Sequence, residues 1–159
     1  MWFIRLLILL LFFIPPISLA KNQTVYFEPK ISELSGRIAI LTVPGPPNYL
    51  SIRKGDKKEI GAYLILDKPI DVKLSSNVQI GNDEPESNIS IIQLVLQNDE
   101  DWKMMENGNH VYINGTLFHA VWARHHTSVL LDAKKIKIIS KGKMNKNKLA
   151  AYLRHAQNL

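Results

Sequence analysis

Short apolar segments separated by turn residues recur along the chain, and this pattern is the strongest constraint on its fold. Proline, glycine, asparagine and aspartate mark the breaks, as in residues 44–49, where proline lacks the donor that a strand ladder needs. No fixed-period repeat occurs. The pattern therefore predicts a mostly β protein. The expected strands are residues 36–43, 60–66, 89–96, 110–119 and 125–138, with 70–74 as a short additional strand.

A short helix is expected between residues 98 and 108. Asn98 can cap the free amides of a helix, and the acidic run 99–101 suits its positive end, so capping explains this cluster better than a cation or catalytic site does. Five main strands with a helix between the third and the fourth is the order of an OB-fold. This small Greek-key barrel binds ligands on one face and through the loops joining strands one to two and four to five. Gly36 would serve the sharp bend of such a barrel.

The first twenty residues predict export. Arg5 gives a short positive start, Leu6 to Ile14 is an unbroken run of nine apolar residues, and Ser18-Leu19-Ala20 places small residues where a signal peptidase reads. Nine residues are too few for a membrane-spanning helix, which takes about 20. We expect cleavage after Ala20 and a periplasmic or secreted mature protein without a transmembrane segment.

The mature chain is long enough for one domain with one core. It contains no cysteine, so any metal site must use histidine, carboxylate or water. The expected division is a cleaved signal peptide at 1–20, an N-terminal extension at 21–34, an OB-like β-barrel domain at 35–140 and a basic C-terminal helix or tail at 141–159.

The C-terminal end is strongly basic. Residues 134–159 include seven lysines and Arg154 with no Asp or Glu. A helix at 145–157 would dock through one apolar face, so its basic groups need not line a nucleic-acid groove. Because export also argues against nucleic acid, we expect no nucleic-acid partner. The docking face would consist of Leu149, Tyr152, Leu153 and Ala156.

Three of the five histidines, His119, His125 and His126, lie within eight positions around an expected hairpin turn. Imidazole is the commonest metal ligand and titrates near neutrality. In unbulged strands His119 and His125 would sit about 5 Å apart at Cβ, close enough to share one divalent transition metal ion. A third ligand would have to come from His126 or a carboxylate. Alternatively, His119 is a barrel-mouth residue bonded to a backbone carbonyl, and His125 and His126 shape the turn.

Two loops carry the other candidate binding residues. Trp122 and Arg124 could stack on a planar or sugar-like ligand or contact a protein partner, or Trp122 could simply anchor the loop. The candidate binding residues are Pro46, Pro47, Asn48 and Tyr49 in the loop between the first two expected strands, and Phe118, Trp122 and Arg124 at the histidine turn.

The sequence shows no nucleophile motif, no carboxylate pair that can be placed and no glycine-rich phosphate loop. Enzymes are therefore the less favoured class.

The chain also resembles a known family, over about Tyr26 to Ile138. The residues that carry the resemblance are Gly45-Pro46-Pro47-Asn48-Tyr49, Gly55-Asp56, Leu64 to Val72, Gln93-Leu94-Val95-Leu96, Gly115 to Ala120, His125-His126-Thr127 and Val129-Leu130-Leu131. They look like a family of small exported bacterial proteins named domain of unknown function 4431. The resemblance implies a bacterial, exported setting and makes the histidine turn a family hallmark, but it implies no established activity.

Departures from the family pattern weaken a multi-histidine site. Val121 and Arg124 stand where the family turn carries further histidines. The family also carries one cysteine near the mature start and another at the position of Asp71. Both cysteines are absent here, which is the pattern that the loss of one disulfide would leave.

We therefore expect an exported, non-catalytic binding module. Its site would be formed by residues 46–49 and 119–126, and its ligand would be a small envelope molecule or a protein partner. The alternatives are a metal-binding protein that uses His119, His125 and His126, and a metal-dependent enzyme that needs a further ligand.

Overall fold

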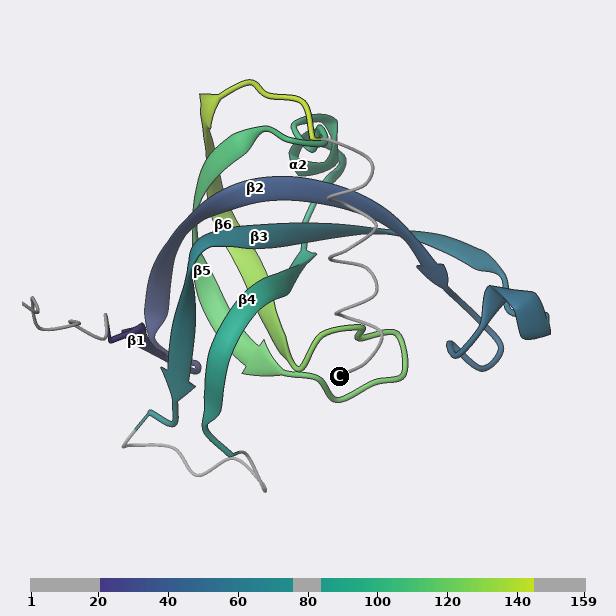
Figure 1. Cartoon of the computed structure of the whole chain (residues 1–159), viewed down its shortest axis with the longest axis horizontal. Helices are drawn as coiled ribbons and strands as arrows, with labels where there is room; N and C mark the ends of the chain where they lie inside the picture. The colour runs from purple at the N-terminus through teal and green to yellow at the C-terminus, as the bar shows by residue number, and fades with distance from the viewer. Residues whose placement is uncertain (1–20, 76–83, 145–159) are drawn as a thin grey trace, which may run out of the picture.

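A computed structural model describes residues 21–75 and 84–144 of the chain (Figure 1). The expected signal peptide and the expected helix at 145–157 lie outside the described residues. The elements are β1 (Gln23–Tyr26), β2 (Ile31–Pro44), a short 3-10 helix η1 (Ile52–Lys54), β3 (Lys58–Lys73), β4 (Glu86–Val95), the helix α2 (Asp99–Lys103), β5 (His110–His119) and β6 (Val129–Ser140).

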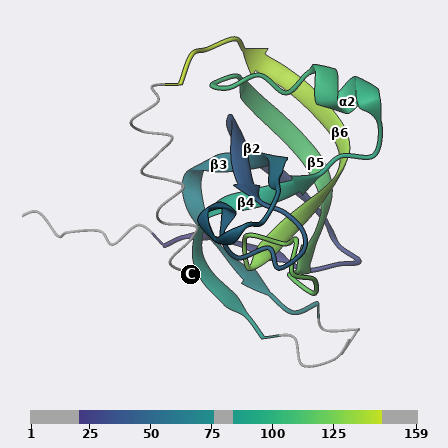
Figure 2. The same cartoon turned by 90° about the vertical axis from the view of Figure 1, so that its right-hand side faces the viewer.

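The six strands form one sheet in the order β1-β3-β2-β5-β6-β4, and β4 pairs in addition with β3. Five strands therefore form a closed circuit of pairings, β2–β3–β4–β6–β5 and back to β2. The β1–β3 and β4–β6 pairs are parallel, and the others are antiparallel. The prediction of a mostly β protein is confirmed. Long, curved β2 and β3 cross over β4, β5 and β6, with α2 at one end of the sheet and the β5–β6 loop at the other (Figures 1 and 2).

The expected helix cap is present. The Asn98 side chain accepts a hydrogen bond from the backbone N–H of Asp101 at 2.8 Å, and three acidic residues occupy the first turn. Helix capping thus gives the acidic run a structural role in this protein.

One strand runs further than its sequence pattern indicates, and another begins later. Segments 60–66 and 70–74 were expected as separate strands, but β3 continues through Lys68-Pro69. Pro69 is tolerated because the pairing of β3 with β4 shifts register between Ile65 and Ile70, so its missing N–H interrupts no regular ladder. In contrast, β6 begins at Val129 and not at residue 125, which leaves residues 120–128 as a loop.

The segment expected as an N-terminal extension is part of the sheet. β1 pairs with the end of β3, and β2 already begins at Ile31. Beyond β1 the chain bridges two strands, because the Phe27 N–H donates to the Lys73 carbonyl at 3.0 Å and the Glu28 N–H donates to the Leu117 carbonyl at 2.8 Å. Phe27 is only 4% exposed. This segment thus links the end of β3 to β5 through backbone hydrogen bonds.

A side-chain bond ties the start of the described chain to β3. The Asn22 amide donates to Asp71 Oδ1 at 3.0 Å, and the same oxygen accepts the Asn88 N–H at 2.9 Å. Asp71 is the position at which the family resemblance implies a cysteine. A polar link therefore joins the start of the described chain to this position in a chain without cysteine.

The main core lies inside the curved sheet. Its largest fully buried apolar side chains are Ile38, Leu64, Ile92, Ile113, Leu117 and Leu131. The backbones of β2 and β3 approach each other closely at Gly36, since a Cβ atom added there would lie 2.2 Å from the Ile65 carbonyl oxygen. Its lack of a side chain permits this close approach.

A second apolar cluster lies on the other face of the sheet. Alternation along β2 sends Ile38 to the main core and Ala39 to this second group, which we call the outer apolar cluster. Antiparallel sheets commonly leave one face to water. Here both faces of β2 and β3 carry buried apolar residues. The outer apolar cluster consists of Ala39, Leu41, Val43, Tyr63, Ile65 and Ile91.

Candidate functional site

The loop between β2 and β3 is folded around one carboxylate, that of Asp56. Its Oδ1 accepts both the backbone N–H and the side-chain amide of Asn48 at 3.0 Å. Its Oδ2 accepts the backbone N–H of Leu50 at 2.8 Å and that of Ser51 at 2.7 Å. Because four donors converge on a residue that is only 6% exposed, the loop has a fixed shape without contacts from another molecule.

These hydrogen bonds favour the charged carboxylate. The bond from the Ser51 N–H has the largest effect on the pKa of Asp56. Together with the bonds from Leu50 and Asn48 it outweighs burial, which acts to raise the pKa, and the pKa of Asp56 is lowered to about 2. The loop is therefore tied together by an anion over the whole physiological pH range.

The fixed loop presents an apolar tip. The Leu50 side chain is exposed, with 81% of the residue accessible, although its own backbone N–H donates to Asp56. Pro47 and Asn48 are exposed, while Pro46 and Tyr49 are half-buried. Of the four residues predicted here as binding residues, Asn48 serves the loop itself through its amide. Sequence reasoning missed Leu50 and Asp56, although Gly55-Asp56 belonged to the family motif.

The loop between β5 and β6 is held by Gln93 of β4. Gln93 Oε1 accepts the His126 N–H at 2.7 Å, and its Nε2 donates to the Arg124 carbonyl at 3.3 Å. Thr127 reinforces the same place, because its hydroxyl accepts the Gln93 N–H at 3.0 Å and donates to the Val129 carbonyl at 2.7 Å. The two family motifs that contain Gln93 and Thr127 are thus joined in space.

This second loop also presents an apolar tip. Val121 is 65% and Trp122 is 70% exposed, and Arg124 is exposed beside them. Within the loop, the His125 N–H donates to the Trp122 carbonyl at 2.9 Å. Phe118, at the end of β5, is half-buried and meets His125 edge-on, with ring centroids 5.9 Å apart.

The three histidines have separate surroundings. His119 stacks on Phe27, with ring centroids 3.9 Å apart. His125 accepts the Val121 N–H on Nδ1 at 3.0 Å. The prediction that His119 and His125 face each other across paired strands is wrong, because His125 lies in the loop before β6. Within residues 21–75 and 84–144, no three His, Asp or Glu side chains are grouped as metal ligands.

Both loop imidazoles favour the neutral form. Burial is the main cause that lowers the pKa of His125, assisted by the positive charges of Arg124 and His126. Burial likewise lowers the pKa of His126, while the charge of Glu59 acts in the opposite direction. A histidine with a lowered folded pKa stabilises the fold at neutral pH, and this contribution is lost as the pH falls below 6.5 toward the folded pKa.

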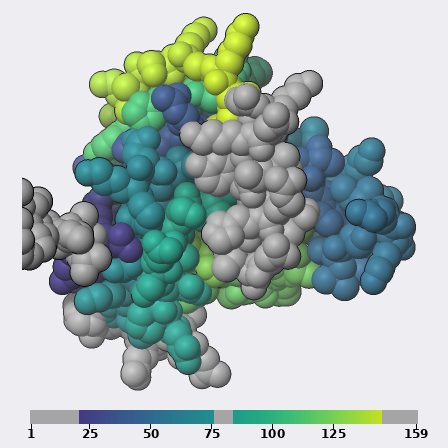
Figure 3. Space-filling view, in the orientation of Figure 1, coloured from purple at the N-terminus to yellow at the C-terminus, as the bar shows by residue number. Residues whose placement is uncertain are grey.

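The two loops are neighbours. Glu59 pairs with Val43 at the foot of the β2–β3 loop, its side chain passes over Gly45, and its charge acts on His126 of the other loop. In the space-filling view the β2–β3 hairpin projects from the body and the β5–β6 loop reaches toward it from below (Figure 3). The sequence prediction placed the candidate residues on these two loops.

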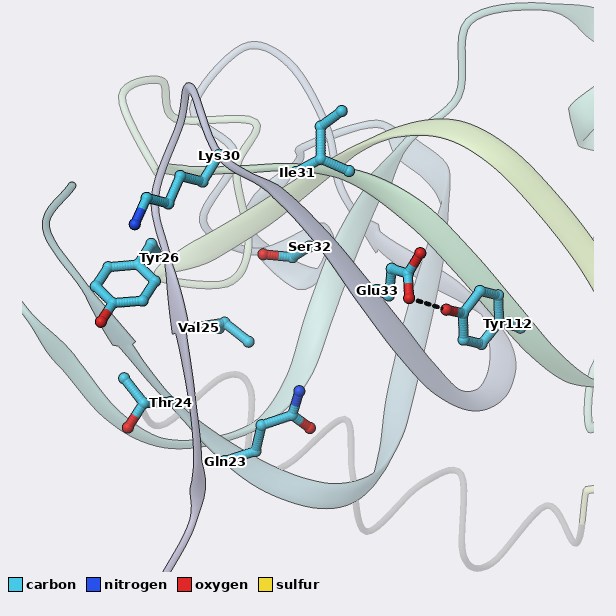
Figure 4. Close-up of a pocket in the computed structure, with 9 residues that line it drawn as sticks. All are labelled: Gln23, Thr24, Val25, Tyr26, Lys30, Ile31, Ser32, Glu33 and Tyr112. Atoms are coloured by element: carbon cyan, nitrogen blue, oxygen red, sulfur yellow. Dashed lines mark hydrogen bonds between the residues drawn. The ribbon is translucent and has the colours of Figure 1, made fainter.

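A separate pocket of about 420 Å³ lies between β1 and the first residues of β2 (Figure 4). Lys30 Nζ rests 4.0 Å from the centre of the Tyr26 ring, and the Tyr112 hydroxyl donates to Glu33 on the opposite side. Sequence reasoning missed this pocket because it depends on β1. None of the predicted binding residues lines it.

The fold and the loops define a small, mostly β protein with one sheet and two internally braced loops with apolar tips. A family model described as Domain of unknown function (DUF4431) matches residues 91–137, and the chain resembles that family over the end of β4, α2, β5 and most of β6. The matched stretch contains Gln93 and the whole β5–β6 loop. Neither a curated protein nor a solved structure matches the chain. Among the helices that the structure describes, none has the length and apolar character to cross a membrane.

The Asp56 bonds predict a specific titration. In a carboxyl NMR titration Asp56 should have its midpoint at about 2, against 3.8 for a free aspartate. Since the folded pKa is lowered, the contribution to stability is complete above pH 3.8 and is lost as the pH falls through about 2. In Asp56→Asn the Leu50 and Ser51 amides should exchange faster at neutral pH. A midpoint near 3.8 with unchanged exchange would show that the carboxylate does not hold the loop.

Replacing Gln93 by alanine should loosen the β5–β6 loop. The variant loses bonds to the Arg124 carbonyl and the His126 amide, and we expect a loss of about 1–2 kcal/mol in unfolding free energy. Hydrogen exchange of the His126 amide should rise more than that of the strand amides. Gln97→Ala, an exposed glutamine just beyond the same strand, is the control and should leave His126 unchanged. Equal exchange in both variants would contradict the role of Gln93.

Metal ions provide a direct test of the histidine loop. We expect Zn²⁺ to leave the thermal unfolding midpoint almost unchanged, because the His119 ring stacks on Phe27 while His125 Nδ1 already accepts the Val121 N–H. The His119→Ala/His125→Ala variant is the control. A saturable rise that disappears in this variant would instead establish metal binding by the loop.

Proposed function

We propose that this protein is an exported, non-catalytic binding module that docks a partner protein through the tips of its β2–β3 and β5–β6 loops. Export rests on the signal-peptide pattern of residues 1–20, with cleavage after Ala20. N-terminal sequencing of the protein from the cell envelope or medium should begin at Lys21. An intact N-terminus in the cytoplasmic fraction would contradict export.

The proposal rests on one observation: the exposed apolar tips belong to loops that hydrogen bonds within the protein already hold in place. Leu50 and Trp122 are 81% and 70% exposed, yet Asp56 and Gln93 hold the backbones that carry them. Leaving large apolar groups in water has a cost that burial against a partner removes. Because the loops are ordered in advance, binding loses little conformational entropy.

The arrangement of strands supports a particular architecture. The closed circuit of five strands, with β4 parallel to β6 and α2 between β4 and β5, is what an OB-like barrel requires. In that architecture the β2–β3 and β5–β6 loops are the two loops that commonly bind ligands. The close approach at Gly36 would give β2 its bend.

A protein suits these tips better than a small envelope molecule does. Small ligands are usually enclosed in concave sites, whereas Leu50, Val121 and Trp122 project outward. Tryptophan and arginine are among the residue types most enriched at the hot spots of protein interfaces, and this loop exposes both Trp122 and Arg124.

Site-specific photo-crosslinking in the cells that produce the protein tests the proposal. A photoreactive phenylalanine at position 50 or 122 should give the same protein adduct from either site. Ile139, which is 51% exposed on β6, is the control position and should not give that adduct. Adducts of equal yield at all three positions, or none at 50 and 122, would contradict docking through the loop tips.

A further inference from the structure

Among the described residues, the first ones of β2 have a neighbouring strand on one side only. Residues 31–37 pair with β5, but the pairing of β2 with β3 begins at Gly36. The end of β3 pairs instead with β1, through residues 70–73. The turn 27–30 joins β1 to β2, and in the part of the chain that the structure describes these two strands do not pair with each other. The pocket of about 420 Å³ lies between their two free edges.

The backbone of β2 directs hydrogen-bonding groups into this pocket. In an antiparallel strand, successive residues direct their N–H and C=O groups alternately to the two sides. The even-numbered residues of β2 face β5, since the Ile38 N–H donates to the carbonyl just before β5 at 2.9 Å. The odd-numbered residues face the other way, since the N–H of Gly45, directly after β2, donates to the carbonyl just before β3 at 2.7 Å. Because the register of β2 does not shift, the groups of Ile31 and Glu33 point to the side on which β1 lies.

β1 contributes a second edge to the pocket. The Phe27 N–H donates to the Lys73 carbonyl of β3 at 3.0 Å. By the same alternation the backbone of Thr24 is directed away from β3, toward the pocket that Thr24 lines. Unpaired N–H and C=O groups on strand edges are the groups to which another extended chain adds as a strand. Both walls of the pocket therefore offer backbone groups with which an extended peptide pairs.

The side chains around the pocket match the alternating side chains of such a peptide. Val25 and Ser32, which are 7% and 6% exposed, are the buried residues of its lining and lie between the two strands (Figure 4). Ile31, by contrast, is 65% exposed. Lys30 and Glu33 are the charged residues of the lining and their charges cancel, so the pocket has no field that favours a polyanion such as nucleic acid.

We propose that this pocket binds an extended peptide segment of a partner protein, which adds as a strand to the free edge of β2. The peptide backbone pairs with Ile31 and Glu33. A peptide side chain directed inward meets Val25 and Ser32, which suits a small or β-branched apolar residue, and the peptide thus carries apolar residues at alternate positions. The volume lies within the range of ligand pockets, about 300–1,000 Å³. No residue of the two docking loops lines this pocket, so the site is independent of the proposed function.

A library of random seven-residue peptides displayed on phage, selected on the purified protein, supplies the probe. The most enriched peptide, made synthetically, should bind Glu33→Pro at least about tenfold more weakly than the parent protein, because proline removes one N–H on the pocket side. The bonds of β2 to β5 come from the even-numbered residues and are kept. Glu33→Ala, the matched control, loses the side chain but keeps the N–H and should bind like the parent. Equal affinity of the parent and Glu33→Pro would overturn the proposal, as would a selection that enriches no peptide.

Hydrogen exchange of the unaltered protein keeps the test valid should Glu33→Pro fail to fold. Without peptide, the Ile31 and Glu33 amides should exchange faster than those of Ser32 and Leu34, which face β5. A saturating concentration of the selected peptide should slow exchange at Ile31 and Glu33 by at least about tenfold. Unchanged exchange at both residues would overturn the proposal. Binding that is lost in Trp122→Ser but kept in Glu33→Pro would assign the peptide to the loop tips and would also overturn it.

Discussion

Replacing Gly36 by alanine is expected to cost about 3 kcal/mol of unfolding free energy or more, a large part of the stability of a domain of this size. The new methyl carbon would lie 2.2 Å from the Ile65 carbonyl oxygen and 2.8 Å from its carbon. Neither atom can move freely, because Gly36 is paired with Leu66 on one side and with Val111 on the other. Relief therefore requires the two strands to separate.

Gly55→Ala is the matched control for this substitution. Gly55 has a positive φ of 107° but open space around its Cβ position, so alanine there should cost only about 1–2 kcal/mol through backbone strain. Urea unfolding of the two variants measures the difference. A Gly36→Ala variant as stable as Gly55→Ala would contradict the close approach of β2 and β3.

Phe27→Ala is expected to destabilise the protein by about 3–5 kcal/mol, the usual cost of removing a buried aromatic side chain. Phe27 is 4% exposed, belongs to the main core and stacks on His119. The neighbouring residue, Tyr26, is 36% exposed, so Tyr26→Ala should cost less than about 1 kcal/mol. Thermal or urea unfolding compares the two adjacent substitutions. Similar small losses from both would mean that residues 21–30 are a dispensable extension.

The sequence predicted the strands that alternate strongly and missed what depends on distant partners. Residues 110–119 match β5 because alternation and turn residues are both local signals. β1 has four residues and only one of them, Val25, is buried, so its pattern is too short to recognise. Its pairing with the end of β3 becomes visible only once the sheet is assembled.

The candidate site was predicted by region and not by residue. Clusters of proline and histidine indicated the two loops, but the exposed tip at Leu50 and the buried carboxylate of Asp56 depend on how the loop closes. The assumption of a tight hairpin also extended the last strand back to His125. Bonds from Gln93, on a different strand, hold that region as a loop instead.

The measurement that tests the central claim most directly is the affinity of the crosslinked partner for four proteins: the parent chain, Leu50→Ser, Trp122→Ser and the double variant. If one partner contacts both braced tips, each single substitution should weaken binding about 30-fold, near 2 kcal/mol, while the unfolding free energy stays nearly unchanged because both side chains are exposed. Ile139→Ser should bind like the parent. Unchanged affinity in either single variant, or an equal loss in Ile139→Ser, would contradict docking through the two loops.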